Sequence, residues 1–216
     1  MKTYSFIIRN AGICALIALL TAATGCGGQG QGNHAIVNKQ CHLALSFPRD
    51  WRVSTGLPHL PVSARHRKLP AVSFNVVIQP LPPQAQEQFK KHGITAPDIL
   101  NNELLKNNMP PGSSQSAYTL DGQPGQQVEM ILSQIIDGRA VYAATTQIIA
   151  LRGLNVYSLT AVSLDQSEQA ARDKLEAIRP QIRQIVSSFR FTDRPFWQRL
   201  WGQILIAVLA LTAAAL

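Results

Sequence analysis

The side chains that could catalyse a reaction or bind a metal are few and scattered along this sequence. No two of the five histidines are four residues apart, the spacing that places a pair of imidazoles on one helix face as metal ligands. The motifs His-Glu-x-x-His, Cys-x-x-Cys and Gly-x-Ser-x-Gly do not occur. Asp173 and Glu176 stand among basic residues, which is typical of a solvated, salt-bridged helix face. The sequence therefore predicts no enzyme, no cofactor and no metal site, and a hydrolase built from distant residues is the weaker alternative.

Cys26 is the cysteine whose neighbours indicate a chemical role. Two basic residues precede an apolar run over residues 11–23, an order typical of a secretory signal. Residues 23–26 read Ala-Thr-Gly-Cys and resemble the lipobox of bacterial lipoproteins, whose cysteine is acylated on sulfur and becomes the mature N-terminus; Ala23 departs from the commoner Leu. We predict a lipoprotein signal peptide over residues 1–25 and a lipid on Cys26. The alternative is an uncleaved anchor, or a plain signal followed by a chance cysteine.

The residues after Cys26 predict a flexible tether over 26–34. Residues 27–32 consist of Gly and Gln alone, a composition typical of flexible linkers. Residues 25–30 match Gly-x-Gly-x-x-Gly, but no strand precedes the match and no helix follows it, so the segment is not a nucleotide site. Cys41 would be the one remaining thiol of the mature chain. We expect it to be a small buried side chain in a strand, with a partner site as the alternative.

The C-terminal residues 196–216 predict a second contact with the membrane. Residues 200–216 are almost entirely apolar, and seventeen helical residues extend roughly 25 Å, slightly less than a ~30 Å hydrocarbon core. Trp197 and Trp201 at the start of this segment are typical of a membrane interface, whereas the arginines before it oppose the positive-inside tendency. We predict a helix inserted in a membrane or lying on one. Packing against the domain or against another protein is the alternative.

The composition excludes a disordered chain and favours an anionic surface as a neighbour. Apolar residues make up 46% of the chain, charged residues make up 15%, and the formal net charge is +8. A positive balance suits an anionic membrane. A nucleic-acid partner is not predicted, because the sequence contains no basic face interleaved with aromatic residues.

Two short basic clusters and one tryptophan are the candidate contacts of the folded part. The possible contacts with an anionic surface are Arg65, His66, Arg67, Lys68, Lys90 and Lys91. The alternative for these residues is an ordinary set of solvated loop charges, with His66 a loop cation at low pH. Trp51 is a possible contact for a partner or ligand, and the alternative is an indole that closes the edge of the core.

Residues 35–192 form one predicted domain of strands and helices. Strands are expected at 41–47 and 71–79, and a proline-rich loop with basic residues is expected over 57–70 between them. Two helices should follow, from residue 82 to about 91 and from residue 97. Four more strands are then predicted, joined by turns that contain Asp-Gly or Arg-Gly, as an antiparallel meander. Their expected ranges are 114–120, 126–136, 139–151 and 154–163.

The last part of the domain predicts a long helix and a short strand. The helix should start near Asp165 or Ser167 and carry one apolar stripe, at steps of three and four residues, that packs against a sheet. Pro180 interrupts this stripe, so a kink or two helical pieces are expected. Residues 188–191 should form the last strand. The fold class is therefore α+β, a layered sandwich around a central antiparallel sheet.

Two short motifs resemble a known superfamily. Residues 45–51, Leu-Ser-Phe-Pro-Arg-Asp-Trp, are similar to the opening of PsbP-like domains, and residues 182–191 are similar to the close of DcrB-like bacterial lipoproteins. The resemblance covers about residues 38–192. It implies an α/β/α-type sandwich and a scaffold without known catalytic residues, which binds proteins or membrane components. We thus expect a non-catalytic lipoprotein that faces the periplasm from the inner or outer membrane and binds an envelope protein; a carrier or chaperone for an apolar ligand or segment is the alternative.

Overall fold

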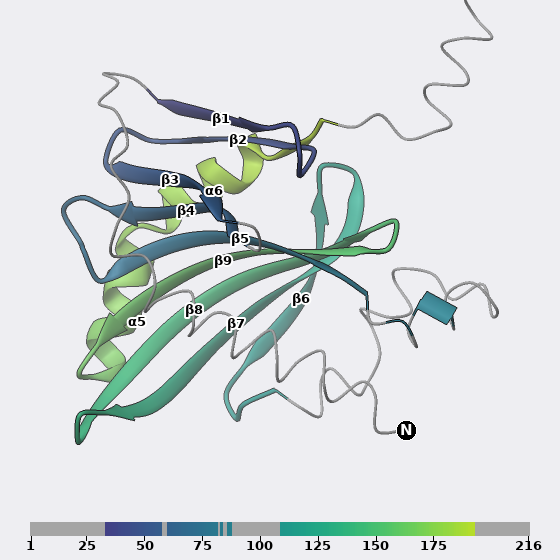
Figure 1. The fold of residues 1–216 in the computed structure, drawn as a ribbon. Helices are drawn as coiled ribbons and strands as arrows, with labels where there is room; N and C mark the ends of the chain where they lie inside the picture. Colours follow the sequence, from purple (N-terminus) through teal and green to yellow (C-terminus); the bar gives the residue numbers. More distant parts are fainter. Residues whose placement is uncertain (1–32, 58–59, 82, 84–85, 88–108, 193–216) are drawn as a thin grey trace, which may run out of the picture.

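The computed structural model describes residues 33–57, 60–81, 83, 86–87 and 109–192 (Figure 1). These residues form two antiparallel sheets and two fully described helices. The larger sheet has seven strands in the order β3-β4-β5-β9-β8-β7-β6, and the smaller sheet has the order β1-β2-β10. The strands are β1 (His34–Asn38), β2 (Leu43–Phe47), β3 (Trp51–Leu57), β4 (Leu60–His66), β5 (Val72–Pro80), β6 (Ser114–Leu120), β7 (Gln123–Ile136), β8 (Arg139–Arg152), β9 (Asn155–Asp165) and β10 (Arg190–Phe191).

Two Asp-Gly dipeptides close two-residue hairpins between long strands. Asp137 and Gly138 have φ angles of 50° and 73°, and Asp121 and Gly122 have φ angles of 47° and 78°. Positive φ at both central positions is the requirement of a type I′ turn, which Asp and Gly tolerate best. Strands β6, β7, β8 and β9 consequently pair in chain order, each antiparallel to the next. They are part of the larger sheet, because β9 also pairs with β5 along its length.

The prediction of a loop over residues 57–70 is wrong. Leu60–His66 is strand β4, which pairs with β3 on one side and with β5 on the other. Pro61 lies next to the first residue of the strand, and a proline near a strand start removes little of the hydrogen-bond ladder. Strand β1 was likewise not expected, because its five residues carry no clear apolar alternation. Both strands gain their stability from pairing with neighbours that sequence periodicity does not reveal.

The C-terminal helical segment consists of two ten-residue helices, α5 (Glu168–Ala177) and α6 (Arg179–Ser188). The single long helix of the predicted fold class is therefore wrong, and the two-piece alternative holds. Helix α5 starts where the sequence predicts, because Ser167 Oγ accepts a hydrogen bond from the Ala170 N–H at 3.2 Å. The chain breaks at Ile178, and Pro180 occupies the first turn of α6, where its missing N–H costs no helical hydrogen bond.

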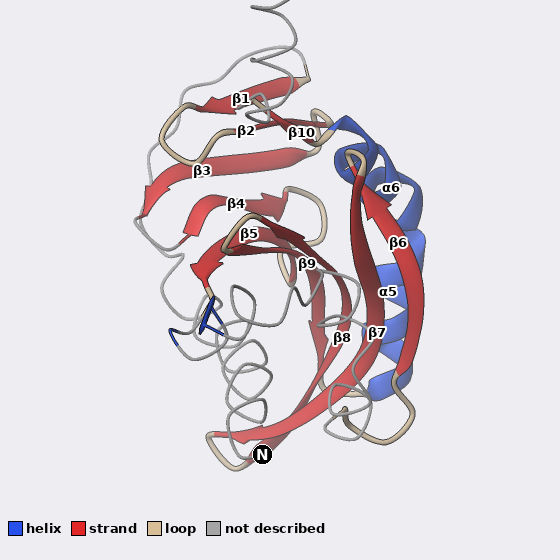
Figure 2. Cartoon of the chain, turned by 90° about the vertical axis from the view of Figure 1, so that its right-hand side faces the viewer, coloured by secondary structure: helices blue, strands red, loops and turns tan. Residues whose placement is uncertain are grey.

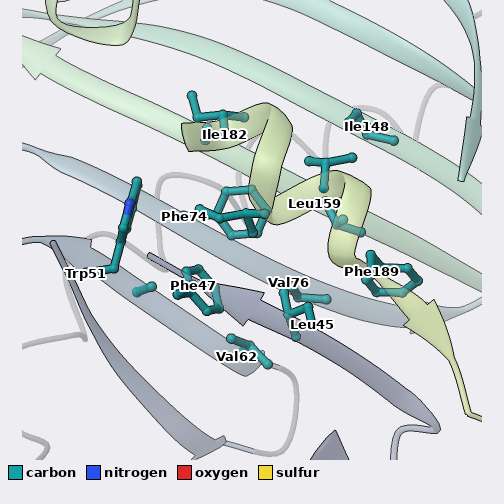
Figure 3. Close-up of a cluster of buried hydrophobic side chains, with 14 of the residues drawn as sticks. Leu45, Phe47, Trp51, Val62, Phe74, Val76, Ile148, Leu159, Ile182 and Phe189 are labelled. Atoms are coloured by element: carbon teal, nitrogen blue, oxygen red, sulfur yellow. The ribbon is translucent and has the colours of Figure 1, made fainter. Parts of the chain in front are cut away.

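One core joins both sheets to the two helices. The predicted apolar stripe is buried at every position. Its members are Ala171, Leu175, Ile178, Ile182 and Ile185. Figure 3 shows Ile182 above the sheet residues, with Phe47, Trp51 and Phe74 grouped at one end and Phe189 at the other. The Phe47 and Phe74 rings meet edge to face, with centroids 5.6 Å apart. Side chains thus fill the space between the larger sheet and the helices in the described part of the protein.

The two faces of the larger sheet differ in character. Helices α5 and α6 lie on the same side of it, while the smaller sheet lies beside β3 (Figures 1 and 2). The face toward the helices is apolar, as the buried Ala64 and Phe74 pair illustrates. We call the opposite face the second face of the sheet. Its polar positions on neighbouring strands are Ser63, Arg65, Ser73, Asn75, Thr145, Gln147, Ser158 and Thr160.

Several predicted segments lie outside the described residues. These are the signal peptide over 1–25, most of the tether over 26–34, the body of the helices predicted from 82 and 97, and the tail over 196–216, and all of them stay predictions. In the part of the chain that the structure describes, neither helix has the length and apolar composition needed to span a bilayer.

Candidate functional site

Trp51 is a core residue and not a surface contact. Its side chain is 0% exposed and lies 5.3 Å from the His66 ring, centroid to centroid, at a near-perpendicular angle. The indole Nε1 donates a hydrogen bond to Gln181 Oε1 at 2.7 Å, which ties the start of β3 to helix α6. The proposal of a partner or ligand contact at Trp51 is therefore wrong. The alternative prediction, that the indole closes the core, is confirmed, because a buried indole needs an acceptor and Gln181 supplies it.

His66 is separated from the basic residues around it. Side chains alternate along β4, so His66 points into the core beside Trp51 and is only 4% exposed. Desolvation by burial lowers the pKa of His66 below its ordinary value of 6.5, and Lys68 lowers it further, while Asp50 and Gln181 act in the opposite direction. Nδ1 accepts a hydrogen bond from the Leu69 N–H at 3.1 Å, a bond that needs the neutral ring. The prediction of His66 as a loop cation or anionic-surface contact is wrong for this reason.

The other residues of the first basic cluster are exposed but divided. Arg65 lies on the second face of the sheet, whereas Arg67 and Lys68 lie in the turn after β4. Lys68 Nζ is 3.4 Å from Asp50 Oδ1, in an ion pair at the surface. Lys90 and Lys91, the second predicted cluster, lie outside the described residues.

Arg65 has charged and polar neighbours that the sequence did not reveal. In the register of the sheet it stands directly opposite Arg52 of β3 on one side and Ser73 of β5 on the other. Residues directly opposite on antiparallel strands point to the same face. Both arginines are exposed, while Ser73 is 9% exposed and its Oγ has no hydrogen-bond partner among the described residues.

The next row of the second face is a network of uncharged polar groups. Ser63 Oγ donates to Asn75 Oδ1 at 2.8 Å, and Gln147 Nε2 donates to Ser158 Oγ at 2.6 Å. Ser158 Oγ and Thr160 Oγ1 are 3.3 Å apart. Buried polar groups need such partners, and the pairing satisfies them across four strands. The signal in the sequence is the alternation of polar and apolar residues along β5 and β9, but only the register shows which of these polar residues lie next to one another.

The β7–β8 hairpin ends in an apolar tip. Residues 133–140 are all exposed, and Ile135 and Ile136 are 75% and 40% exposed. Figure 1 shows the hairpin extending beyond the body of the sheet. Adjacent strand residues point to opposite faces, so the two isoleucines present apolar surface on both sides of the hairpin.

Cys41 was predicted to be a small buried side chain in a strand, and the structure places it differently. It lies in the turn before β2 and is half-buried, with its N–H donating to Asn38 Oδ1 at 3.0 Å.

Among the described residues, no group of three or more His, Cys, Asp and Glu side chains is arranged to hold a metal ion.

Comparisons with known proteins give structural likenesses at low identity. No family model and no curated protein matches the chain. The solved structures that it resembles include a protein of Bacteroides thetaiotaomicron, at 10% identity and a TM-score of 0.46. The cyanobacterial PsbP of Synechocystis is similar at 13% identity and a TM-score of 0.38. LpqN of Mycobacterium tuberculosis, which is involved in cell envelope biogenesis, is similar at 18% identity and a TM-score of 0.43.

The three matches cover similar shares of this chain but different shares of the three solved structures. The match with the Bacteroides protein covers 76% of this chain and 50% of that protein. The match with PsbP covers 78% of this chain and 98% of PsbP, and the match with LpqN covers 74% of this chain and 91% of LpqN. This chain therefore matches about half the length of the Bacteroides protein. A PsbP is among the similar structures, and the narrower DcrB-like assignment stays a prediction.

Proposed function

We propose that this chain is a non-catalytic binding module of the bacterial cell envelope, anchored by a lipid on Cys26, which binds a partner protein through the tip of its β7–β8 hairpin. The observation that carries the binding proposal is the exposure of Ile135 and Ile136. Of the three large apolar side chains exposed in the described part, these two share one hairpin tip, and Val37 on β1 is the third.

The tip has the properties of a binding anchor. Exposed apolar side chains gathered at one place mark interaction sites, and burying an isoleucine side chain gains about 1.5–3 kcal/mol. The type I′ turn at Asp137-Gly138 fixes the register, with Ile135 opposite Ala140 and Ile136 opposite Arg139. A hairpin that is already ordered loses little conformational entropy when a partner binds it.

The sequence around Cys26 supports the envelope setting. The lipobox-like residues 23–26 would place a lipid eight residues before His34, the first residue of β1. An extended chain of eight residues reaches at most roughly 28 Å. The folded domain would thus work close to the membrane surface, where an envelope partner could meet the hairpin.

The packing favours this proposal over a carrier for an apolar ligand. A carrier of the expected kind would hold its ligand between the sheet and the helices. In the described residues that space is occupied by side chains such as Phe47, Phe74 and Ile185, all nearly or fully buried. A solid core with apolar groups outside it is the arrangement of a protein-binding module.

Site-specific crosslinking in intact cells tests the binding proposal. A photoreactive benzoylphenylalanine replaces Ile135 in the full chain, and the same group replaces the exposed Gln184 of α6 as the control position. We expect a discrete crosslinked species from position 135 alone. Ile136→Asp should abolish that species, and Ser116→Asp on the exposed side of β6 should leave it. The same species from both positions, or none from 135, would contradict the proposal.

The anchor is tested separately. Mass spectrometry of the chain isolated from bacterial membranes should find a mature N-terminus at Cys26 that carries diacylglyceryl and an amide-linked acyl chain. Cys26→Ser should release the chain from the lipid fraction or leave its signal uncleaved. An unmodified Cys26 on a chain that still begins at Met1 would overturn the lipoprotein assignment.

A further inference from the structure

We propose that Arg52, Arg65 and Ser73 form a binding site for a phosphate group on the second face of the larger sheet. The site lies on β3, β4 and β5 and involves neither the β7–β8 hairpin nor Cys26, so it stands independently of the proposed function. Its ligand is a phosphate-bearing molecule, either a lipid headgroup at the membrane surface or a soluble phosphate compound.

The register of the sheet places the three residues in one row. Arg52 is paired with Arg65, and Arg65 is paired with Ser73. Directly opposite residues of antiparallel strands have Cβ atoms about 4.5–5.5 Å apart on the same face. Two guanidinium groups and one hydroxyl group are therefore carried side by side across three neighbouring strands.

The arginine pair is unfavourable without an anion. Like charges directly opposite each other on a sheet destabilise it. A charged residue on an edge strand protects against aggregation, and this accounts for Arg52, because β3 is the edge of the larger sheet. It does not account for Arg65, because β4 is paired on both sides. A bound oxyanion between the two guanidinium groups turns their repulsion into attraction for the ligand.

Ser73 supplies the second, independent observation. It is 9% exposed, and its Oγ has no hydrogen-bond partner among the described residues. A buried hydroxyl group without a partner costs free energy, which a ligand oxygen would recover. The neighbouring buried polar groups of the second face differ from it, because Ser63, Asn75 and Thr160 are paired among themselves or with Ser158.

The surroundings are free of competing carboxylates in the described strands. On the second face of β3, β4, β5, β9 and β8, the register positions carry no carboxylate, and the charged residues there are Arg52, Arg65 and, at the hairpin end of β8, Arg139. Asp50, just before β3, is paired with Lys68. Glu129 of β7 is paired with Arg179 of helix α6 and thus belongs to the helix side. The site is consequently positive and is bordered by hydroxyl and amide groups.

Phosphate fits this set of groups better than a carboxylate does. Guanidinium groups bind phosphate through parallel N–H donors, and a phosphate has enough oxygens to accept from two arginines and a serine hydroxyl at once. A carboxylate has two oxygens, which the two arginines alone would occupy.

Protection of the arginines from phenylglyoxal tests the site. The full chain in dodecyl maltoside micelles, a detergent without phosphate, reacts with phenylglyoxal in phosphate-free buffer, and mass spectrometry gives the rate at each arginine. Inorganic phosphate should slow the modification of Arg52 and Arg65 severalfold and leave the exposed Arg183 of α6 unchanged. Adding phosphatidylglycerol to the micelles, without inorganic phosphate, tests the lipid source.

The outcomes separate the two sources and can overturn the site. Protection by inorganic phosphate in the lipid-free micelles indicates a soluble ligand, and protection by phosphatidylglycerol alone indicates a headgroup. Ser73→Ala should weaken protection about fivefold, the value of one hydrogen bond, without lowering the melting temperature, because the hydroxyl has no partner to lose. The proposal would be refuted if Arg183 were protected as strongly as Arg52 and Arg65, or if neither phosphate nor phosphatidylglycerol gave protection. Unchanged protection in Ser73→Ala would refute it as well.

Discussion

The indole Nε1 of Trp51 donates to Gln181 Oε1 at 2.7 Å, across 130 residues of sequence. This bond joins the first residue of β3 to helix α6 at the end of the core where Phe47 and Phe74 also meet the indole ring. We expect Gln181→Ala to lower the free energy of unfolding by about 1–3 kcal/mol, because a buried indole N–H loses its acceptor. Urea denaturation measures the change. The control is Gln184→Ala on the exposed side of the same helix, which should change stability by less than about 0.5 kcal/mol.

The buried His66 should make the domain less stable in mild acid. Burial lowers its pKa in the folded protein below the ordinary value of 6.5. The unfolded chain therefore binds the proton more readily, so the contribution of the neutral ring is complete above about pH 6.5 and decreases as the pH falls below it. Melting temperatures measured between about pH 7.5 and 5 should fall, and the decrease should be smaller in His66→Phe.

The matched control for this pH dependence is His42→Asn. His42 is exposed in the turn before β2 at a φ of 52°, a conformation that Asn adopts readily. This variant should keep the acid sensitivity of the parent. If His66→Phe and the parent have the same slope of melting temperature against pH, the assignment to His66 is wrong.

Glu129 and Arg179 connect the sheet to helix α6. Arg179 Nη1 donates to Glu129 Oε1 at 2.6 Å, and this hydrogen bond is the main reason why the pKa of Glu129 lies below its ordinary value. We expect Glu129→Gln to destabilise the protein by about 0.5–1 kcal/mol at neutral pH, a small value because both side chains are partly exposed. The loss should shrink as the pH falls below about 4.5 and vanish only below the lowered pKa of Glu129 in the folded protein, where protonation removes the charge in the parent as well.

A double-mutant cycle separates this pair from its neighbours. Arg179 also donates to Glu176 Oε2 at 2.5 Å, so Glu176→Gln is the matched control within the helix surface. We expect a coupling energy between Glu129 and Arg179 that exceeds the coupling between Glu176 and Arg179, because Glu176 is the more exposed carboxylate. Equal coupling energies would show that Glu129 has no special role.

Gly125 of β7 should not tolerate a side chain. A Cβ atom at this position would lie 2.6 Å from the carbonyl oxygen of Ile149, which is backbone and cannot rotate away. We predict that Gly125→Ala costs about 1–3 kcal/mol, the range of overpacking in a dense core. Gly112→Asn is the control, because its φ of 78° suits Asn and no atom lies within 4 Å of the added carbon. Similar thermal stability of the two variants would contradict the prediction.

Sequence reasoning succeeded where the signal is local. The Asp-Gly turns could be predicted because positive φ restricts the residues that fit, and the start of α5 could be predicted because Ser167 offers an acceptor to its first turn. It failed for β4, since a seven-residue strand with a proline and two basic side chains has the composition of a loop. The position of Trp51 was also ambiguous, because an indole can close a core or face a ligand until its acceptor, Gln181, is known.

The sequence by itself determined the conformations that depend on near neighbours: two tight hairpins, an apolar helical stripe and its interruption before Pro180. Only the tertiary structure decided which side chains of β4 share a face with which side chains of β3 and β5. Strand register is set by backbone pairing between segments far apart in the chain, and a shift by one residue would move every side chain to the other face. That register places Arg52, Arg65 and Ser73 in one row on the second face of the sheet. It also places the neighbouring His66 on the opposite face, where it is buried beside Trp51.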